Sequence, residues 1–140
     1  MKTWVHSIFS LILAIIFYPE FGWETLSILI GGVLIDVDHY LWYIFKFKNF
    51  DLFRCYTYFI FDIRKMHWKD ILGSILIFHT IEFLALSVFL SFYSDFALLF
   101  TIGLIGHYIL DMIWHFFVPR MVLVNHSVIY WFLKNNIQKV

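Results

Sequence analysis

Four long stretches of apolar residues dominate this 140-residue chain, at positions 4–18, 23–45, 71–93 and 96–118. Hydrophobic residues make up 62% of the chain and charged residues only 14%, whereas a water-soluble domain typically carries about 25% charged residues. Stretches of roughly 17–25 apolar residues are long enough to cross a bilayer as helices. We therefore predict an all-α integral membrane protein, with residues 1–140 forming a single membrane domain of four transmembrane helices.

The first stretch is the shortest of the four. Pro19 is expected to end it, because proline lacks the backbone N–H that a helix interior uses. With Lys2 before it, the 4–18 stretch resembles a signal peptide, which begins with a basic residue. No cleavage site of small residues follows, so we expect this stretch to be a transmembrane helix that is not removed. Only Ser94 and Asp95 separate the third and fourth stretches, which predicts a tight antiparallel hairpin.

The basic residues predict the orientation. All ten Lys and Arg residues precede the first stretch, lie between the second and third, or follow the fourth, while the opposite loops carry Glu20, Glu24 and Asp95. By the positive-inside rule, both termini and the middle loop lie in the cytoplasm. Ten acidic residues balance the ten basic ones, so binding of nucleic acid through a basic surface is excluded.

Two shorter segments are expected to lie along the membrane interface. In the middle loop, about residues 50–65, apolar residues recur at near-helical spacing between charged ones. In the tail, about residues 122–134, an apolar run is too short to cross the bilayer. Each segment predicts an amphipathic interfacial helix.

Ionisable side chains inside the predicted spans indicate a functional site. Such groups are costly in hydrocarbon and face a cavity, a partner or a metal. With a rise of about 1.5 Å per residue, most of them fall at matching depths, roughly 10–20 Å below the cytoplasmic surface. Helix bundles bind metals through inward carboxylates and histidines, so we predict one or two divalent ions, zinc first, with manganese or iron(II) as alternatives. The candidate metal ligands are His6, Asp36, Asp38, His39, His79, Glu82, His107 and Asp111.

Asp36 and Asp38 present a geometric conflict. On a regular helix, residues two apart point to nearly opposite sides, whereas Asp36 and His39 share a face. Either Asp38 lies behind the ligands, or the helix is irregular at this point. The neighbouring Gly31 and Gly32 favour the irregular helix.

These motifs resemble those of the membrane-bound metal-dependent hydrolase family. That family has an early histidine, a Pro-Asp-x-Asp-His signature after an apolar run, a His-Ser element and a late Gly-x-x-x-His-x-x-x-Asp. His6 corresponds to the early histidine, residues 35–39 to the signature with Ile35 in place of proline, and residues 103–111 to the late element. The third element matches less well, through His79 followed by threonine. The resemblance implies a metal-dependent hydrolase in the plasma (inner) membrane of a prokaryote.

Together these features predict a hydrolase that cleaves phosphoester bonds, or as a second choice acyl bonds, of lipid or lipid-like phosphate substrates at the cytoplasmic leaflet. One or two ions would acidify a metal-bound water that attacks the bond. Asp38 and Glu82 are candidates for bridging ligand or general base, and His115 for proton donor.

Two alternatives need no catalysis. The same groups would bind a divalent ion in a transporter, a sensor or a metal-stabilised scaffold, or would only hold the helices together as a hydrogen-bond network. A transporter should carry polar groups through the full bilayer. Apart from Glu24 at the outer edge of the second stretch, the extracytoplasmic halves of the predicted spans contain no Asp, Glu, Lys, Arg or His, which disfavours a path for ions.

Overall fold

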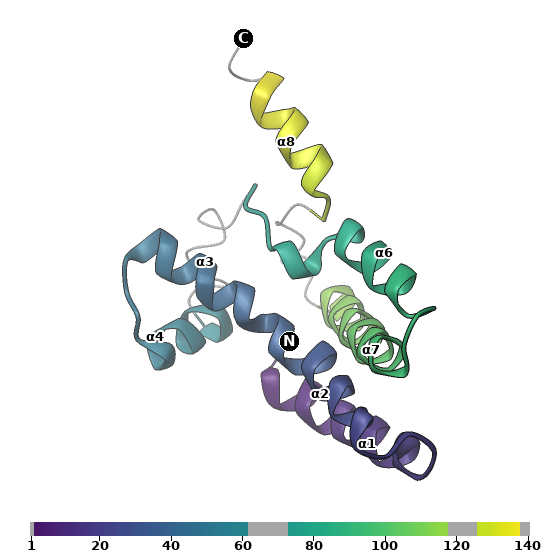
Figure 1. The fold of residues 1–140 in the computed structure, drawn as a ribbon. Coiled ribbons are helices and arrows are strands. Elements are labelled where there is room, and N and C mark those ends of the chain that lie inside the picture. Colours follow the sequence, from purple (N-terminus) through teal and green to yellow (C-terminus); the bar gives the residue numbers. More distant parts are fainter. Residues whose placement is uncertain (1, 62–72, 118–125, 138–140) are drawn as a thin grey trace.

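The computed structural model describes residues 2–61, 73–117 and 126–137, and every regular element in these ranges is a helix (Figure 1). The predicted all-α class is therefore confirmed for the described part of the chain. The helices are α1 (Thr3–Phe21), α2 (Leu26–Val33), α3 (Val37–Phe47), α4 (Leu52–Thr57), α6 (Ile81–Leu90), α7 (Asp95–Phe117) and α8 (Val128–Ile137), joined in part by the 3-10 turns η1 (Gly22–Thr25), η2 (Leu34–Asp36) and η4 (Ile77–His79).

Two helical stretches in the described ranges are long and apolar enough to cross a membrane, Thr3–Phe47 and Asp95–Trp114. Four spans are therefore not confirmed by this criterion. The first stretch is not straight, because it contains the turns η1 and η2. The third predicted span, 71–93, contains only the shorter apolar helix Ile81–Ser91.

Helices α1 and α2 form an antiparallel hairpin. Ser10 lies against Gly32, and Ala14 belongs to the same buried cluster as Ile28. The reversal occurs at Gly22, whose φ of 57° suits a residue without a β-carbon and whose N–H bonds to the carbonyl of Tyr18.

The expectation that Pro19 ends the first helix is wrong. Pro19 lies inside α1, in its last turn, and the helix continues to Phe21. Proline removes one intrahelical hydrogen bond there, and the positive φ of Gly22 ends the helix instead.

Helices α2 and α7 make the most extensive helix contact of the described chain, through two glycines that we call the glycine crossing, Gly31 and Gly103. A β-carbon on Gly31 would lie 2.1 Å from the carbonyl oxygen of Phe100, and one on Gly103 would lie 2.2 Å from that of Ile28. The two backbones are thus in direct contact, which fixes α7 against the end of α2.

Helix α6 differs most from the sequence expectation. It starts at Ile81 and has ten residues, because Thr80 acts as its N-cap with the hydroxyl accepting from the N–H of Phe83 at 3.4 Å. The preceding segment is the 3-10 turn η4, which carries His79. Hydropathy alone cannot show this break, because apolar residues continue through it.

The two predicted interfacial segments are helical over part of their length. Residues 52–61 of the 50–65 segment wind as α4 followed by a π-helical turn, and residues 62–65 lie outside the described ranges. In the tail, α8 begins at Val128, while residues 122–125 lie outside the described ranges. Figure 1 shows α8 projecting away from the other helices.

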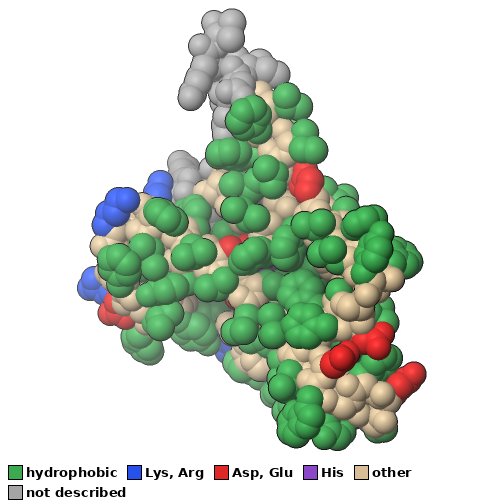
Figure 2. All heavy atoms as spheres, viewed as in Figure 1, with side chains coloured by type: hydrophobic (Ala, Val, Ile, Leu, Met, Phe, Trp, Pro, Cys, Tyr) green, Lys and Arg blue, Asp and Glu red, His purple; other side chains and the backbone are tan. Residues whose placement is uncertain are grey.

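The surface agrees with an apolar environment. Figure 2 shows hydrophobic side chains over most of the visible face. Lys and Arg side chains gather over α3 and α4, and the largest group of visible carboxylates lies at the opposite end, while single carboxylates are visible elsewhere, one of them beside α4.

Candidate metal centre

The described chain brings together all of the predicted metal ligands except Glu82. They come from α1, the η2–α3 junction, η4 and α7. Three overlapping groups of three side chains each have ligand atoms within 4.8 Å of one another and could hold a metal ion. We call the whole set the polar cluster; it consists of His6, Asp36, Asp38, His39, His79, His107 and Asp111.

The interruption between α2 and α3 lets both aspartates enter the cluster. Val33 has φ −130° and ψ −50°, and residues 34–36 form the turn η2 instead of continuing the α-helix. Asp36 Oδ1 then lies 3.6 Å from His79 Nε2, while Asp38 Oδ2 lies 3.0 Å from His79 Nδ1. The helix is irregular here, as Gly31 and Gly32 suggested.

Four ligand atoms converge at the centre of the polar cluster. His79 Nε2 and His107 Nε2 are 3.2 Å apart, and Asp36 Oδ1 lies 3.5 Å from His107 Nε2. Asp111 Oδ2 lies 3.3 Å from His107 Nε2 and 3.9 Å from His79 Nε2. Ligand atoms about 2.0–2.1 Å from one zinc ion lie about 3.3–3.4 Å apart in a tetrahedron. Oδ1 of Asp36 and the Nε2 atoms of His79 and His107 lie 3.2–3.6 Å apart, which suits three ligands of one tetrahedral ion, with Asp111 Oδ2 as a candidate fourth ligand.

The outer nitrogens of the two central histidines are held by oxygen acceptors. His107 Nδ1 lies 2.9 Å from the carbonyl oxygen of Gly32, which can only accept, so the ring proton is on Nδ1. His79 Nδ1 lies 3.0 Å from the carboxylate of Asp38. Metal-binding histidines are typically oriented in this way, with one nitrogen donating to a carboxylate or backbone carbonyl and the other facing the ion.

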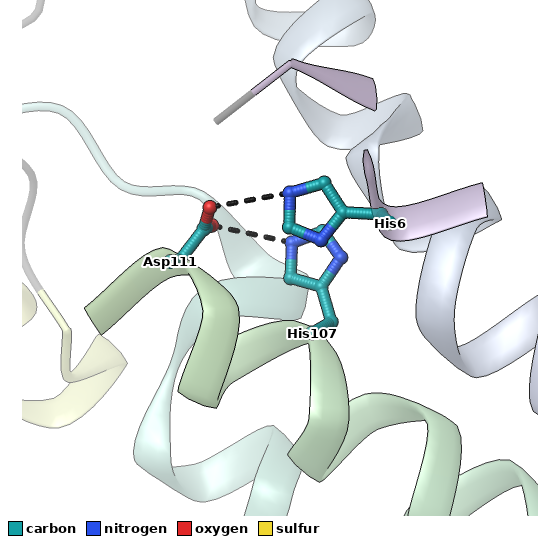
Figure 3. Close-up of side chains that lie close together, drawn as sticks. All are labelled: His6, His107 and Asp111. Carbon is teal, nitrogen blue, oxygen red and sulfur yellow. Dashed lines mark ion pairs between the residues drawn. The ribbon is translucent and has the colours of Figure 1, made fainter. Parts of the chain in front are cut away.

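His6 is buried in the cluster without a hydrogen bond. Its side chain is 0% exposed, and neither ring nitrogen bonds to the described part of the chain. The ring stacks on His107 with centroids 3.9 Å apart and an angle of 18° between the planes. Figure 3 shows both rings directing a nitrogen toward Asp111, and His6 Nε2 is 3.3 Å from Asp111 Oδ1.

Asp38 connects the two histidines nearest to it. Its Oδ1 lies 2.9 Å from His39 Nδ1, and its Oδ2 accepts from the N–H of Phe78 at 3.1 Å. Both oxygens are therefore engaged with His39, His79 and the η4 backbone. Asp38 therefore orients both histidines even though the helix is irregular, and it also belongs to one of the three groups that could hold an ion, with His39 and His79.

The assignment of Glu82 as a ligand or general base needs correction. Its carboxylate accepts from the N–H groups of Val128 and Ile129 at 3.1 and 3.2 Å and from the hydroxyl of Ser127. It therefore stabilises the start of α8. The prediction assumed one helix through His79 and Glu82, whereas α6 begins only at Ile81, so the two residues do not share a helical face.

The remaining predicted participant is His115, the candidate proton donor. His115 lies on α7, but its side chain is outside the described part of the chain. Cys55 is buried between Tyr43 and Tyr58, and burial raises the pKa of its thiol to about 11, so it stays protonated at neutral pH.

Sequence reasoning missed two groups that build the site. The carbonyl of Gly32 orients His107, and the hydroxyl of Tyr108 donates to the carbonyl of Phe78 at 2.5 Å, which holds the η4 turn next to α7. A backbone carbonyl leaves no signal in a sequence. Tyr108 did leave a signal, because its hydroxyl group lies next to His107 within a mainly apolar helix.

The chain was compared with family models, with curated proteins and with solved structures, and it matches none of them.

Proposed function

We propose that this chain is an integral membrane hydrolase that uses a bound divalent metal, zinc first, to cleave phosphoester bonds of lipid-like molecules at the cytoplasmic leaflet. Acyl esters are the second substrate class. The resemblance to membrane-bound metal-dependent hydrolases supports the same reaction type.

One observation carries the metal part of the proposal. The centre of the polar cluster contains two imidazole nitrogens and two carboxylate oxygens at 3.2–3.9 Å. The ring proton of His107 is engaged by Gly32, and the Asp38 carboxylate favours the outer nitrogen of His79 as its donor. When both histidines are neutral, these two nitrogens and the carboxylate oxygens beside them are all acceptors and repel one another, and a cation between them would remove that repulsion.

The proposed topology has four crossings with both termini in the cytoplasm. Helix α1, the α2–α3 stretch, α6 with its preceding turn, and α7 would each cross. The non-helical segment at His79 fits this topology, because irregular backbone is tolerated at membrane depth where it is buried in protein or lines a cavity. Its polar groups are paired accordingly, with Phe78 bonding to Asp38 through its N–H and to Tyr108 through its carbonyl.

The polar cluster is more open on one side. The side chains of Asp36 and His39 are 24% and 27% exposed, whereas His6 and His107 are 0% exposed. The ring of Phe59, in the turn after α4, packs edge-on against His39 at 5.0 Å. A substrate would approach at this side, past the α4 segment that the sequence predicts to lie in the membrane interface.

In the proposed reaction, the metal ion would act as a Lewis acid and a side chain of the protein would accept the proton. When bound, the metal supplies Lewis acidity, which polarises the substrate oxygen and makes water a stronger acid. His39 lies at the open side with Nδ1 held 2.9 Å from Asp38. An imidazole held in this way can take a proton from the attacking water, with Asp38 positioning it.

An ion path through the membrane is less well supported. Beyond the polar cluster, Ile28 and Leu99 are 0% exposed, and the glycine crossing leaves no space between α2 and α7. Ala14, Ile28 and Leu99 form a buried apolar cluster there. A site that opens on one side suits binding and catalysis better than transport.

The test compares metal content and hydrolysis in detergent-purified protein. Asp36→Asn should lose bound zinc and hydrolysis of detergent-dispersed phosphatidic acid, whereas Asp95→Asn, at the first residue of α7, should keep both. Chelation should abolish the wild-type activity and zinc should restore it. Wild-type zinc content in Asp36→Asn would overturn the metal site, and equal turnover of water-soluble p-nitrophenyl phosphate would overturn the lipid substrate.

A further inference from the structure

We propose that the polar cluster holds a second divalent ion, between His6 Nε2 and Asp111 Oδ1, next to the ion at the centre. This inference rests on the proposed function, because it assigns a second position at the same site. Water or substrate oxygens would complete the coordination of the second ion, since it has two protein ligands.

The stacking of His6 and His107 favours two ions over one. Their planes differ by 18° and their centroids are 3.9 Å apart. Each Nε2 faces Asp111, so the two lone pairs run side by side and do not converge on one point. Metal ions in two-metal sites lie about 3.5–4 Å apart, which matches the spacing of the rings.

Asp111 is arranged as a bridge between the two positions. Its Oδ1 lies 3.3 Å from His6 Nε2, and its Oδ2 lies 3.3 Å from His107 Nε2 (Figure 3). Each carboxylate oxygen thus faces a different histidine. A carboxylate with one oxygen on each ion is a common link in two-metal sites.

The burial of His6 gives independent support. A fully buried imidazole without a hydrogen bond is costly, because its desolvation is not compensated. His6 is 0% exposed, and both of its ring nitrogens lack a hydrogen bond to the described residues. The one polar contact of the ring with the described residues is the ion pair of Nε2 with Asp111 Oδ1 at 3.3 Å, which needs a proton on Nε2; a second ion would take the place of that proton.

The charge balance also favours a second ion for an anionic substrate. The polar cluster has three carboxylates, Asp36, Asp38 and Asp111, so with neutral histidines its formal charge is −3. One divalent ion leaves −1, and a second changes this to +1. Only the second value attracts a phosphoester electrostatically.

The experiment measures zinc stoichiometry in the purified full-length chain. Metal-free protein in detergent is titrated with Zn²⁺ alone, and bound zinc per chain is determined by elemental analysis after removal of free metal. Wild type should bind two ions, and His6→Ala should bind one. Ser10→Ala is the control, because Ser10 is buried on the same face of α1 one turn away; it should bind two.

Each outcome has a separate meaning. One ion in wild type would overturn the second position while leaving the proposed function intact, and none would overturn both. Two ions in His6→Ala would overturn the role of His6. His6→Gln, which keeps most of the side-chain volume, should also bind one ion, so a folding defect in His6→Ala does not decide the result.

Discussion

The glycine crossing and the polar cluster both involve α2 and α7 or the segments next to them, but the crossing is a backbone contact and the cluster is a contact between side chains. At the crossing, α2 and α7 are regular and touch through their backbones, so nothing larger than glycine fits. One turn further along α7, at His107, the neighbouring segments are interrupted, and side chains fill the space between them. The tight glycine contact holds α2 and α7 in place, and the helix interruptions at η2 and η4 direct the candidate ligands toward one another.

The largest expected effect comes from widening the crossing. Gly103→Leu would place side-chain atoms against the carbonyl of Ile28, only 2.2 Å from the first added carbon. Overpacking against backbone should destabilise the protein by about 3 kcal/mol or more. Thermal unfolding in detergent would measure this loss. Ala85→Leu, on the exposed face of α6, is the control and should change little; equal stability of both variants would show that the crossing is not needed.

Removing a central ligand should affect metal binding while leaving the crossing intact. His107→Ala and His79→Ala each delete one of the nitrogens that lie 3.2 Å apart. We expect zinc affinity to fall by more than the roughly 10–100-fold typical of residues that only orient a ligand. Competition with a chromogenic chelator measures the affinity, and circular dichroism checks the helix content. Unchanged affinity in both variants would show that the polar cluster is a packing network.

Substitution of Asp38, whose carboxylate contacts the Nδ1 atoms of His39 and His79, should have a smaller effect on zinc affinity. Asp38→Asn keeps the size of the side chain but weakens its bonds to His39 and His79. Zinc affinity should fall by about 10–100-fold, with the number of bound ions unchanged. The same chelator competition gives both values. A loss of one ion per chain would instead identify Asp38 as a direct ligand.

The smallest expected effect is at Glu82, which lies outside the polar cluster. Glu82→Gln removes the charge at the start of α8 and should cost about 1 kcal/mol locally, as the loss of a helix cap does. Faster hydrogen exchange in α8 would report it. Zinc content should remain at the wild-type value, and a loss of zinc would return Glu82 to the metal site.

The sequence was sufficient to predict most of the polar residues that meet, because depth along a helix follows from position. His107 and Asp111 lie one turn apart on the regular helix α7, as expected, whereas His6 was a predicted ligand whose position alone placed it nearer the membrane surface. Glu82 was misplaced because its position depended on a helix through residues 77–80, where Thr80 caps α6 and the backbone changes course. The end of α1 at Gly22, beyond Pro19, is a similar case. Such breaks are decided by local hydrogen bonds that hydropathy does not report.

The shortness of α6 has a consequence for the surrounding bilayer in the proposed topology. A ten-residue helix is about 15 Å long, roughly half the thickness of the hydrocarbon core. Lipids accommodate such hydrophobic mismatch by local thinning. Headgroups beside α6 would then lie deeper than elsewhere, which shortens the distance a lipid must move to bring its phosphate to His79.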